Sequence, residues 1–447
     1  MNFPLQEVAA ALGLPAANVP PGQVTGWSVD SRSIARGDLF FALCGPNHDG
    51  HDFVRDALAQ GAAAAVVERP VAAEGVILET ASSLEALEAL ARWARGRWTG
   101  RMVAVTGSAG KTTTKEIIAR LLGTSMTVGK STGNLNNHIG LPLSLLRLPA
   151  DAPAAVLEIG MNHSGEIRRL AGIAAPQIGV VTNVGHAHVE HFASIEDVAL
   201  AKRELIEAFS SGGVAVLNAD DPRVARFREV HPGRSVTFGL SPGADVRAEE
   251  VVERPEGVRF RLGAARFESP LAGIHNVSNL LAGLAVAGLF GIEPHDLREA
   301  VAALEAVERR GRRFIHRGAV VLDDCYNANP EAVHRMLDLL CAEPAGRRLA
   351  VLGEMLELGR MSVALHRNVG RYAARHGIDV LVGIRGAARE MIQGAVEAGM
   401  SRDAVFFFEE PGEAGEFLSG RIRPGDAVLF KGSRGTRVEL ALERYMR

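Results

Sequence analysis

The chain has 447 residues, of which 47% are hydrophobic, and its formal net charge is −3. This length exceeds what one hydrophobic core usually organises, so we expect two or three globular domains. The small net charge provides no broad basic surface, so we expect no nucleic acid partner, and no apolar run is long enough to predict membrane insertion.

Residues 1–99 are predicted to form a small α/β domain that has no nucleotide-binding loop of its own. Short strands are expected near residues 24–29, 39–43 and 63–67, followed by a helix over residues 84–97. The first residues, MNFPLQEVAA, lack the basic and apolar segments of a secretory signal. Together with three cysteines that lack disulfide or zinc-site spacing, this start predicts a cytoplasmic protein.

Residues 102–116, MVAVTGSAGKTTTKE, run from an apolar strand through a glycine-bearing turn into a helix. In such a turn, backbone N–H groups and the helix N-terminus bind phosphate oxygens, and Lys111 would reach the outer phosphates of a nucleotide. A hydroxyl of Thr112 or Thr113 would ligate magnesium. Val105 stands where the usual P-loop pattern has its first glycine, so a turn that binds no phosphate is the alternative.

Two further domains are predicted from alternating strands and helices. Residues 100–308 contain the apolar runs MVAVTG, AAVLEIG, IGVVTNV and GVAVLN, which are typical of a parallel sheet buried on both faces. Residues 309–447 repeat the alternation with AVVLDD, RLAVLG, DVLVGI, AVFFF and DAVLFKG. The predicted fold class is therefore α/β with three domains: a central P-loop mononucleotide-binding parallel sheet follows the first, and the last is Rossmann-like and doubly wound.

The segment STGNLNNHIGLP at residues 131–142 is too polar for a strand and too rich in glycine for a helix. We interpret it as a loop that hydrogen-bonds a ligand, although asparagines that only serve turns are the alternative. Glu158 stands near the end of the next apolar strand, where a carboxylate is costly unless it meets a cation. Because strand carboxyl ends line the ligand crevice of such sheets, we expect Glu158 to bind magnesium.

The next strand ends in NVGHAHVEH, so His186, His188 and His191 are closely spaced. Zinc is one interpretation; we prefer one histidine that supports a magnesium and phosphate assembly. Lys202 lies on the apolar stripe of the following helix, which opens with a capping box from Ser194. An inward lysine must lose its proton, meet an anion or be modified, for example to a carbamate able to bind a second magnesium; snorkelling to the surface is the alternative.

Polar residues also cluster in the second half of the chain. Asn276 is expected to cap a helix that starts near His275, whereas Asn279 could contact an adenine edge. An arginine-rich stretch at residues 309–317 is better explained by one phosphate-facing arginine than by RNA binding. Asp323 and Asp324 end one strand, and residues 431–434, KGSR, close another, where an interdomain crevice is expected. The alternatives are that Asn329 caps a helix and that Lys431 and Arg434 form a solvated basic end.

In this order, the segments DSRSIARGDLFFALCG, TGSAGKTTTKE, GNLNNHIGLP, EIGMNHSGEI, NVGHAHVEHF, AKRELIE, HNVSN, DDCYNANP, VLGEMLELG and KGSRG resemble the Mur ligases of peptidoglycan precursor synthesis. The resemblance covers nearly the whole chain. Ala109 and Cys325 depart from the asparagine and serine more often found there. The YNANP form favours the family member that adds a dipeptide. It argues against the family member that acts in the preceding step and adds a single amino acid.

The resemblance implies roles for individual residues. ATP would be bound by Gly107, Ser108, Ala109, Gly110, Lys111, Thr112, Thr113, Asn279, Arg312 and Asp324. Magnesium would be held by Thr112, Glu158, His188 and Lys202, the last as a carbamate. The substrates would be bound by Ser31, Thr132, Asn136, Asn137, Asn327, Asn329, Lys431 and Ser433. Lys111, Lys202 and His188 would be the catalytic residues.

The activity implied is ATP-dependent ligation of D-alanyl-D-alanine to UDP-N-acetylmuramoyl-tripeptide through an acyl phosphate, with Mg²⁺. The expected partners are these small molecules, and the expected state is a monomer. Another Mur-type ligase that adds a single amino acid, or a folylpolyglutamate-synthase-like ligase, is the enzymatic alternative. A nucleotide-dependent switch would leave Glu158, His188 and Lys202 without a purpose.

Overall fold

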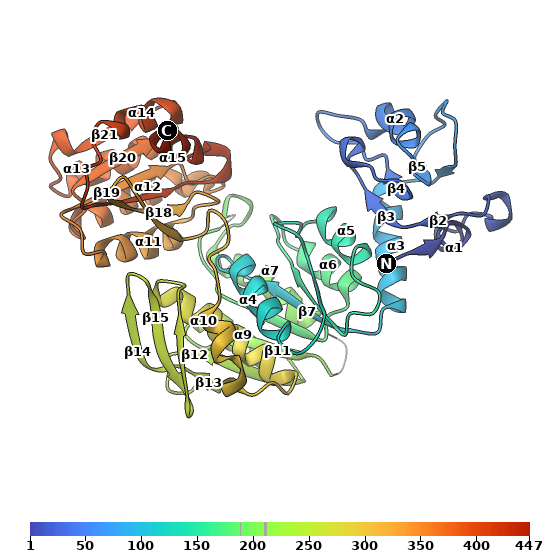
Figure 1. The fold of residues 1–447 in the computed structure, drawn as a ribbon, viewed down its shortest axis with the longest axis horizontal. Coiled ribbons are helices and arrows are strands. Elements are labelled where there is room, and N and C mark those ends of the chain that lie inside the picture. The colour runs from blue at the N-terminus through green and yellow to red at the C-terminus, as the bar shows by residue number, and fades with distance from the viewer. Residues whose placement is uncertain (188, 210–211) are drawn as a thin grey trace.

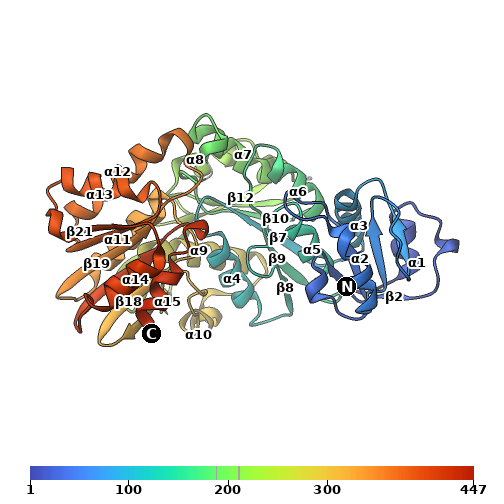
Figure 2. The same cartoon turned by 90° about the horizontal axis from the view of Figure 1, so that it is seen from above.

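The computed structural model describes residues 1–187, 189–209 and 212–447. The chain forms three α/β bodies. The N-terminal and C-terminal bodies stand apart above the central one in Figure 1, and all three lie in a row when seen from above in Figure 2. Among the described residues, no helix has the length and apolar character needed to cross a membrane.

The N-terminal body is built on a parallel sheet of four short strands with order β3-β4-β5-β6. An antiparallel pair, β1 and β2, lies beside it. The strands are β1 (Phe3–Pro4), β2 (Gln23–Val24), β3 (Gly26–Ser28), β4 (Asp38–Phe41), β5 (Ala64–Val67) and β6 (Ile77–Glu79). The helices are α1 (Leu5–Ala11), α2 (Val54–Ala59) and α3 (Ser83–Arg97). The Ser82 hydroxyl caps α3 by accepting from the Glu85 N–H.

The central body has a parallel sheet of seven strands with order β13-β12-β11-β10-β7-β9-β8. These strands are β7 (Arg101–Thr106), β8 (Val128–Lys130), β9 (Ala154–Glu158), β10 (Ile178–Val181), β11 (Val214–Asn218), β12 (Arg234–Gly239) and β13 (Val246–Arg247). The helices are α4 (Lys111–Leu122), α5 (Gly140–Leu146), α6 (Glu166–Ala174), α7 (Ile195–Glu207), α8 (Pro222–Ala225), α9 (Ile274–Leu289) and α10 (Arg298–Ala302). β9 and β10 are buried along their whole length, which explains their continuous apolar sequence.

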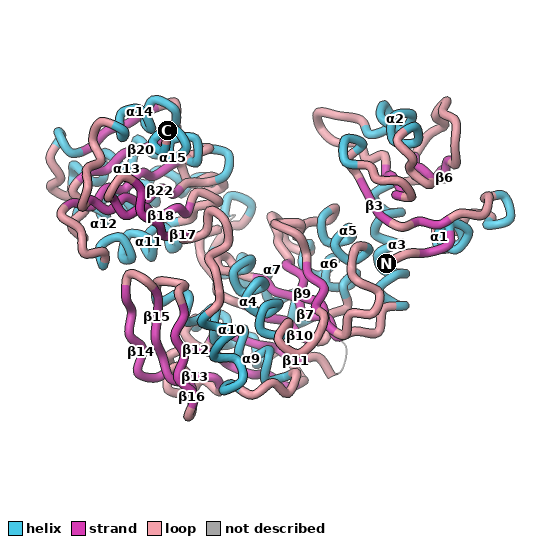
Figure 3. The backbone as a smooth tube through the Cα atoms, viewed as in Figure 1, coloured by secondary structure: helices cyan, strands magenta, loops and turns pink. Residues whose placement is uncertain are grey.

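An antiparallel sheet of three strands follows β13 and was not predicted from the sequence. It consists of β14 (Glu249–Arg254), β15 (Gly257–Leu262) and β16 (Ala265–Ser269). Figure 3 shows it below the C-terminal body.

The C-terminal body has a sheet of six strands with order β17-β18-β22-β19-β20-β21, in which only β17 is antiparallel to its neighbour. The strands are β17 (Arg312–His316), β18 (Ala319–Asp324), β19 (Arg347–Gly353), β20 (Val380–Ile384), β21 (Val405–Phe408) and β22 (Asp426–Lys431). The helices are α11 (Pro330–Ala342), α12 (Ser362–Arg375), α13 (Ala388–Glu397), α14 (Pro411–Ser419) and α15 (Glu439–Met446). From β18 the chain runs outward through β19 and β20 to β21, and it then returns to place β22 between β18 and β19, as in a doubly wound fold. The predicted fold class is confirmed.

The N-terminal body is fixed to the central one by buried polar contacts. The Arg95 guanidinium, 8% exposed, donates to the carbonyls of Ala174 and Ala175 at 2.7 and 3.0 Å. Arg147 donates to the Trp27 carbonyl at 2.6 Å. These contacts tie the first body to α5 and α6. Apolar side chains of both bodies also belong to one continuous core, which extends into the C-terminal body.

Candidate active site

The phosphate loop connects β7 to α4 and is shaped by glycine. Gly107 and Gly110 have φ values of 150° and 80°, and Gly110 is the N-cap of α4. The loop is also held by residues that follow β10. The Thr182 hydroxyl donates to the Ala109 carbonyl at 2.6 Å, and the Asn183 Oδ1 atom accepts from the Ala109 N–H at 2.9 Å. The loop therefore keeps its shape through the neighbouring strand.

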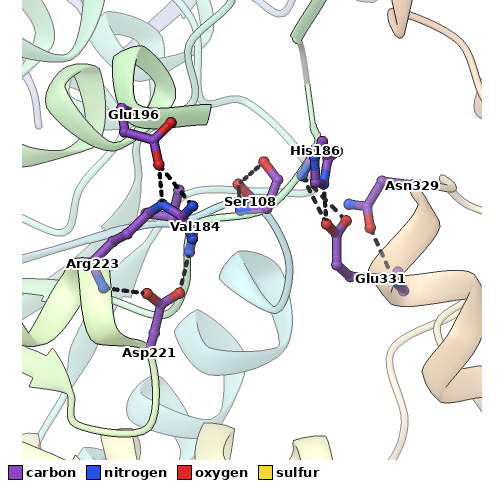
Figure 4. A network of polar contacts seen from close by, with 10 residues as sticks. Ser108, Val184, His186, Glu196, Asp221, Arg223, Asn329 and Glu331 are labelled. Atoms are coloured by element: carbon purple, nitrogen blue, oxygen red, sulfur yellow. Dashed lines mark hydrogen bonds and ion pairs between the residues drawn. The ribbon is translucent and has the colours of Figure 1, made fainter. Parts of the chain in front are cut away.

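Two side chains of the loop make further contacts. The Ser108 hydroxyl donates to the Gly185 carbonyl and accepts from the Gly185 N–H, at 3.1 and 2.8 Å (Figure 4). The Lys111 ammonium donates to the Gly107 carbonyl at 2.8 Å and thus lies across the loop. Desolvation lowers the pKa of Lys111, and the Glu158 carboxylate opposes the shift. An anion bound in this loop would favour the charged lysine.

Glu158 meets two of the predicted ligand-binding side chains. It stands at the end of β9 and is 2% exposed. Its Oε2 atom accepts from the Thr112 hydroxyl at 2.6 Å, and its Oε1 atom accepts from the Asn136 amide at 2.7 Å. Three elements far apart in the sequence therefore place a hydroxyl, a carboxylate and an amide together. Such hard oxygen donors are suited to magnesium.

Lys202 lies inside the central body. It is 1% exposed, which excludes snorkelling to the surface. The Ser194 hydroxyl caps α7 by accepting from the Asp197 N–H, as the capping box predicts. Burial lowers the pKa of Lys202 well below its ordinary value, and Lys111 lowers the pKa further. The amine is therefore neutral in a pH range where an exposed lysine is charged.

Two of the three histidines after β10 are described, and they contact different residues. His188 lies outside the described residues. His186 bonds to Glu331 of α11 through its N–H and its Nδ1 atom (Figure 4), and the centroid of the His191 ring lies 4.4 Å from that of His163, with the two rings tilted by 38°. Within the described residues, these histidines form no cluster that could hold a metal ion.

One metal-type cluster in the described part of the chain lies instead in the N-terminal body, at Cys44, Asp49 and His51. The His51 Nε2 atom accepts from the Glu68 N–H at 2.9 Å, so the ring proton is on Nδ1, where it faces Asp49 at 2.6 Å. Because this proton occupies the nitrogen that faces the cluster, the ring orientation does not favour a metal.

The C-terminal body contributes the opposite wall. The Lys431 ammonium contacts Asp324 at 2.5 Å and the Asn327 carbonyl at 2.8 Å, so it holds two other predicted residues in place. Asn329 caps α11 by accepting from the Ala332 N–H, which confirms the cap alternative. Asn279 is 7% exposed and accepts from the Thr114 hydroxyl at 3.1 Å.

The expectation that Asn276 caps α9 is wrong. The helix already begins at Ile274, after Gly273, and the Asn276 amide donates to the Ala272 carbonyl at 2.7 Å. Gly273 has a φ of 96° and takes the capping position without a side-chain bond.

A single cavity of about 700 Å³ unites most of the predicted residues. The predicted residues that line it are Ser108, Ala109, Gly110, Lys111, Thr112, Thr113, Asn136, Asn137, Glu158, Asn279, Asp324, Asn327, Asn329 and Lys431. The described residues that were predicted for the site but do not line the cavity are Ser31, Gly107, Thr132, Lys202, Arg312 and Ser433. Ser31 is in the N-terminal body, and Ser433 is buried against the carbonyl of Ala328.

Several lining residues were not predicted. They include His275, Arg310, Tyr326 and Arg335. The Arg310 guanidinium stacks 4.0 Å from the Tyr326 ring, whereas Arg312 is exposed at the start of β17. The arginine-rich stretch was the available signal, but it does not show which arginine faces the cavity.

The chain was compared with known proteins. The family model "Mur ligase family, catalytic domain" matches residues 23–98, "Mur ligase middle domain" matches residues 105–287, and "Mur ligase, glutamate ligase domain" matches residues 308–434. A relative from Bacillus subtilis (strain 168), named UDP-N-acetylmuramoyl-tripeptide--D-alanyl-D-alanine ligase, is 33% identical over 93% of this chain and 92% of its own.

Solved structures give the same result. The crystal structure of MurF from Acinetobacter baumannii has a TM-score of 0.91 and 31% identity, and covers 100% of this chain and 99% of that one. MurF ligase from Thermotoga maritima in complex with ADP has a TM-score of 0.84 and 31% identity, and covers 95% of this chain and 97% of that one. This chain belongs to the Mur ligase family.

Proposed function

We propose that this chain joins D-alanyl-D-alanine to UDP-N-acetylmuramoyl-tripeptide with hydrolysis of ATP to ADP and phosphate. The relatives that match nearly its whole length are named for this reaction. The observation that carries the proposal is the cavity where the phosphate loop, Asn136, Glu158 and Asp324 meet. A ligase of this kind has to hold a triphosphate beside a carboxylate and an amine, and the cavity joins the two bodies that would do so.

The roles of individual residues follow from their positions. Residues 107–113 bind the ATP phosphates, with Lys111 released from the Gly107 carbonyl to reach the γ-phosphate. Asn279 and Asp324 contact the nucleoside, and Arg310, rather than the exposed Arg312, supplies the arginine that faces the phosphates. Asn136 and Asn137 meet the UDP-linked substrate together with Thr132, while Ser31 binds its uridine end. Asn327, Asn329, Lys431 and Ser433 shape the dipeptide site.

The donor set around Glu158 fits Mg²⁺. The Thr112 hydroxyl and the Glu158 carboxylate lie 2.6 Å apart, and both are oxygen donors of the kind that this ion prefers. Bound Mg²⁺ would neutralise charge on the ATP phosphates. A carbamate on Lys202 would add a further oxygen ligand. His188 is the histidine to which we assign magnesium binding, as the family resemblance implies.

The reaction proceeds in two balanced steps. The terminal carboxylate of the tripeptide attacks the γ-phosphorus of ATP, which gives an acyl phosphate and ADP. The dipeptide amine, whose pKa is ordinarily about 7.7 to 8.0, then attacks the acyl carbon. Phosphate leaves and the nitrogen loses one proton, so an amide remains. Lys111 and the loop N–H groups lower the repulsion between the two anions in the first step.

We retain the domain limits 1–99, 100–308 and 309–447 for UDP-substrate binding, ATP binding and closure over the dipeptide. We also place the reaction in the cytoplasm, and the free thiols of all three cysteines agree with a reducing compartment. A monomer suffices for this scheme, because the cavity is formed by one chain.

Phosphate release measured with UDP-N-acetylmuramoyl-tripeptide, with and without D-alanyl-D-alanine, tests the proposal. We expect release to require both substrates, and we expect Lys111→Ala to lower it about a hundredfold, because the γ-phosphate loses its cation. Arg120→Ala changes an exposed residue of the same helix and should leave the rate unchanged. Release that ignores the dipeptide, prefers a single amino acid or survives Lys111→Ala contradicts the proposal.

A further inference from the structure

Lys115 is a buried lysine of α4 that none of the roles above uses. It follows Lys111 by one helical turn, and its side chain is 0% exposed. Its ammonium donates to the Ser131 carbonyl at 2.7 Å and to the Gly133 carbonyl at 3.1 Å, and it lies 3.1 Å from the Glu116 carboxylate. These three partners use all three donors of the ammonium.

The two carbonyls belong to one turn and flank Thr132. The N–H of Ser131 donates to the Val156 carbonyl at 3.2 Å, and its hydroxyl accepts from the Glu158 N–H at 3.2 Å. These bonds attach the turn to β9. The turn continues into the loop of Asn136, whose amide donates to Glu158 at 2.7 Å. Lys115 therefore connects the phosphate-binding helix to the loop expected to hold the other substrate.

A side chain that only filled this space would not need a charge, since an apolar side chain of similar volume avoids the cost of desolvation. Glu116 does not need Lys115 for neutralisation either, because Lys130 contacts the same carboxylate at 2.5 Å. What Lys115 alone provides is the pair of bonds to the turn. Its loss would leave two carbonyls, one of them on the buried residue Ser131, without their donor.

We propose that Lys115 is a positioning residue that fixes the turn at residues 131–133 against α4, so that the loop of Thr132 and Asn136 presents the UDP-linked substrate to the phosphates of ATP. This inference rests on the proposed function for the identity of the substrate. It goes beyond that function because it assigns the alignment of the two substrates to a lysine that contacts neither of them.

Steady-state kinetics of Lys115→Met test the role. We expect the KM for UDP-N-acetylmuramoyl-tripeptide to rise about tenfold, as the loss of bonds to a buried carbonyl predicts, while the KM for ATP stays unchanged. Lys130→Met is the matched control. Its side chain is 48% exposed and contacts Glu116 but neither carbonyl, so both KM values should remain those of the wild type. Equal rises in both KM values, or the same effect in Lys130→Met, overturn the proposal.

Hydrogen exchange measured by mass spectrometry without substrates provides a second readout. Residues 131–139 should exchange faster in Lys115→Met than in the wild type or Lys130→Met, and unchanged exchange there overturns the role. If Lys115→Met does not fold, Lys115→Gln, which keeps a shorter donor, is measured in the same way. A wild-type enzyme that ignores the dipeptide would refute the proposed function instead, and the exchange result would still decide the role of Lys115.

Discussion

Lys202 combines burial with a reactive side chain. It is 1% exposed, and burial lowers the pKa of its ammonium, so deprotonation begins at a lower pH than for a free lysine. A neutral amine can form an N–C bond with carbon dioxide, releasing one proton and leaving a carbamate. The change replaces a buried cation that is repelled by Lys111 with an anion that is attracted to it.

We therefore predict that Lys202→Ala loses most of its ligase activity and that short carboxylates such as acetate partly restore it. Arg203→Ala is the neighbouring control, because Arg203 pairs with Glu207 on the helix surface. Wild-type activity should fall in buffer freed of carbon dioxide and bicarbonate, because no carbamate can form, and added bicarbonate should restore it. The restoration should be weaker at lower pH, since only the neutral amine reacts. Full activity of Lys202→Ala in bicarbonate-free buffer would refute the carbamate.

At the scale of single residues, the sequence is most informative where one physical requirement decides the residue type. Glu158 at the end of a buried strand was expected to meet a cation; the structure places the Thr112 hydroxyl and the Asn136 amide on its carboxylate, and the magnesium role stays a prediction. Arg310 could not be distinguished from Arg312, because the choice depends on where β17 begins and on which side its residues alternate. Lys115 was missed because two of its three partners are main-chain carbonyls, which leave no mark in the sequence.

At the scale of elements, the shape of the phosphate loop depends on its two glycines, Gly107 and Gly110. Gly110 has a φ of 80°, and a Cβ atom there would lie 2.6 Å from the Asn279 Oδ1 atom. An alanine would favour another loop shape, and nucleotide binding would have to restore the original one at a cost of about 1–3 kcal/mol. The space that a side chain at residue 110 would need is thus occupied by Asn279, which we propose contacts the nucleoside of ATP.

We predict that Gly110→Ala weakens ATP binding about tenfold or more, measured by titration calorimetry. Gly172→Ala provides the contrast. This glycine is in the interior of α6, where a Cβ atom meets nothing within 4 Å, so alanine should leave ATP binding unchanged. It should raise the free energy of unfolding by about 0.5–1 kcal/mol. Equal ATP affinity in the two variants would show that the loop tolerates a side chain.

Strands could be predicted from the sequence mainly where both of their faces are buried, because such strands have continuous apolar sequences. The apolar runs of β7, β9, β10 and β11 predicted four strands of the central sheet, and those of β18 to β22 predicted the parallel strands of the C-terminal one. The strands β8, β12, β13 and β17 were not predicted. The sheet β14-β15-β16 was missed because its strands mix charged and apolar residues; β14 is EEVVER and mostly exposed. The start of α9 was misplaced because Gly273 caps it through backbone shape rather than through a side chain.

At the scale of the whole molecule, polar contacts between described residues also join the C-terminal body to the central one. Besides the bonds between His186 and Glu331, the Glu190 N–H donates to the Glu357 carbonyl at 3.0 Å, and Arg360 donates to the Ala193 carbonyl at 3.2 Å. Figure 4 shows Glu331 directed from α11 toward His186, which follows the residue that hydrogen-bonds to Ser108. The phosphate loop and the C-terminal body thus meet on neighbouring residues, Gly185 and His186. The sequence predicted three modules but not this junction, which depends on contacts between distant segments.

The central claim is that these bodies bring a peptide carboxylate to the γ-phosphate of ATP. The direct test uses UDP-N-acetylmuramoyl-tripeptide labelled with ¹⁸O in its terminal carboxylate, with mass analysis of the phosphate released on addition of D-alanyl-D-alanine. Attack by the carboxylate predicts that each phosphate carries one oxygen from the peptide. Released phosphate without ¹⁸O, whose fourth oxygen comes from water and not from the peptide, would contradict the account.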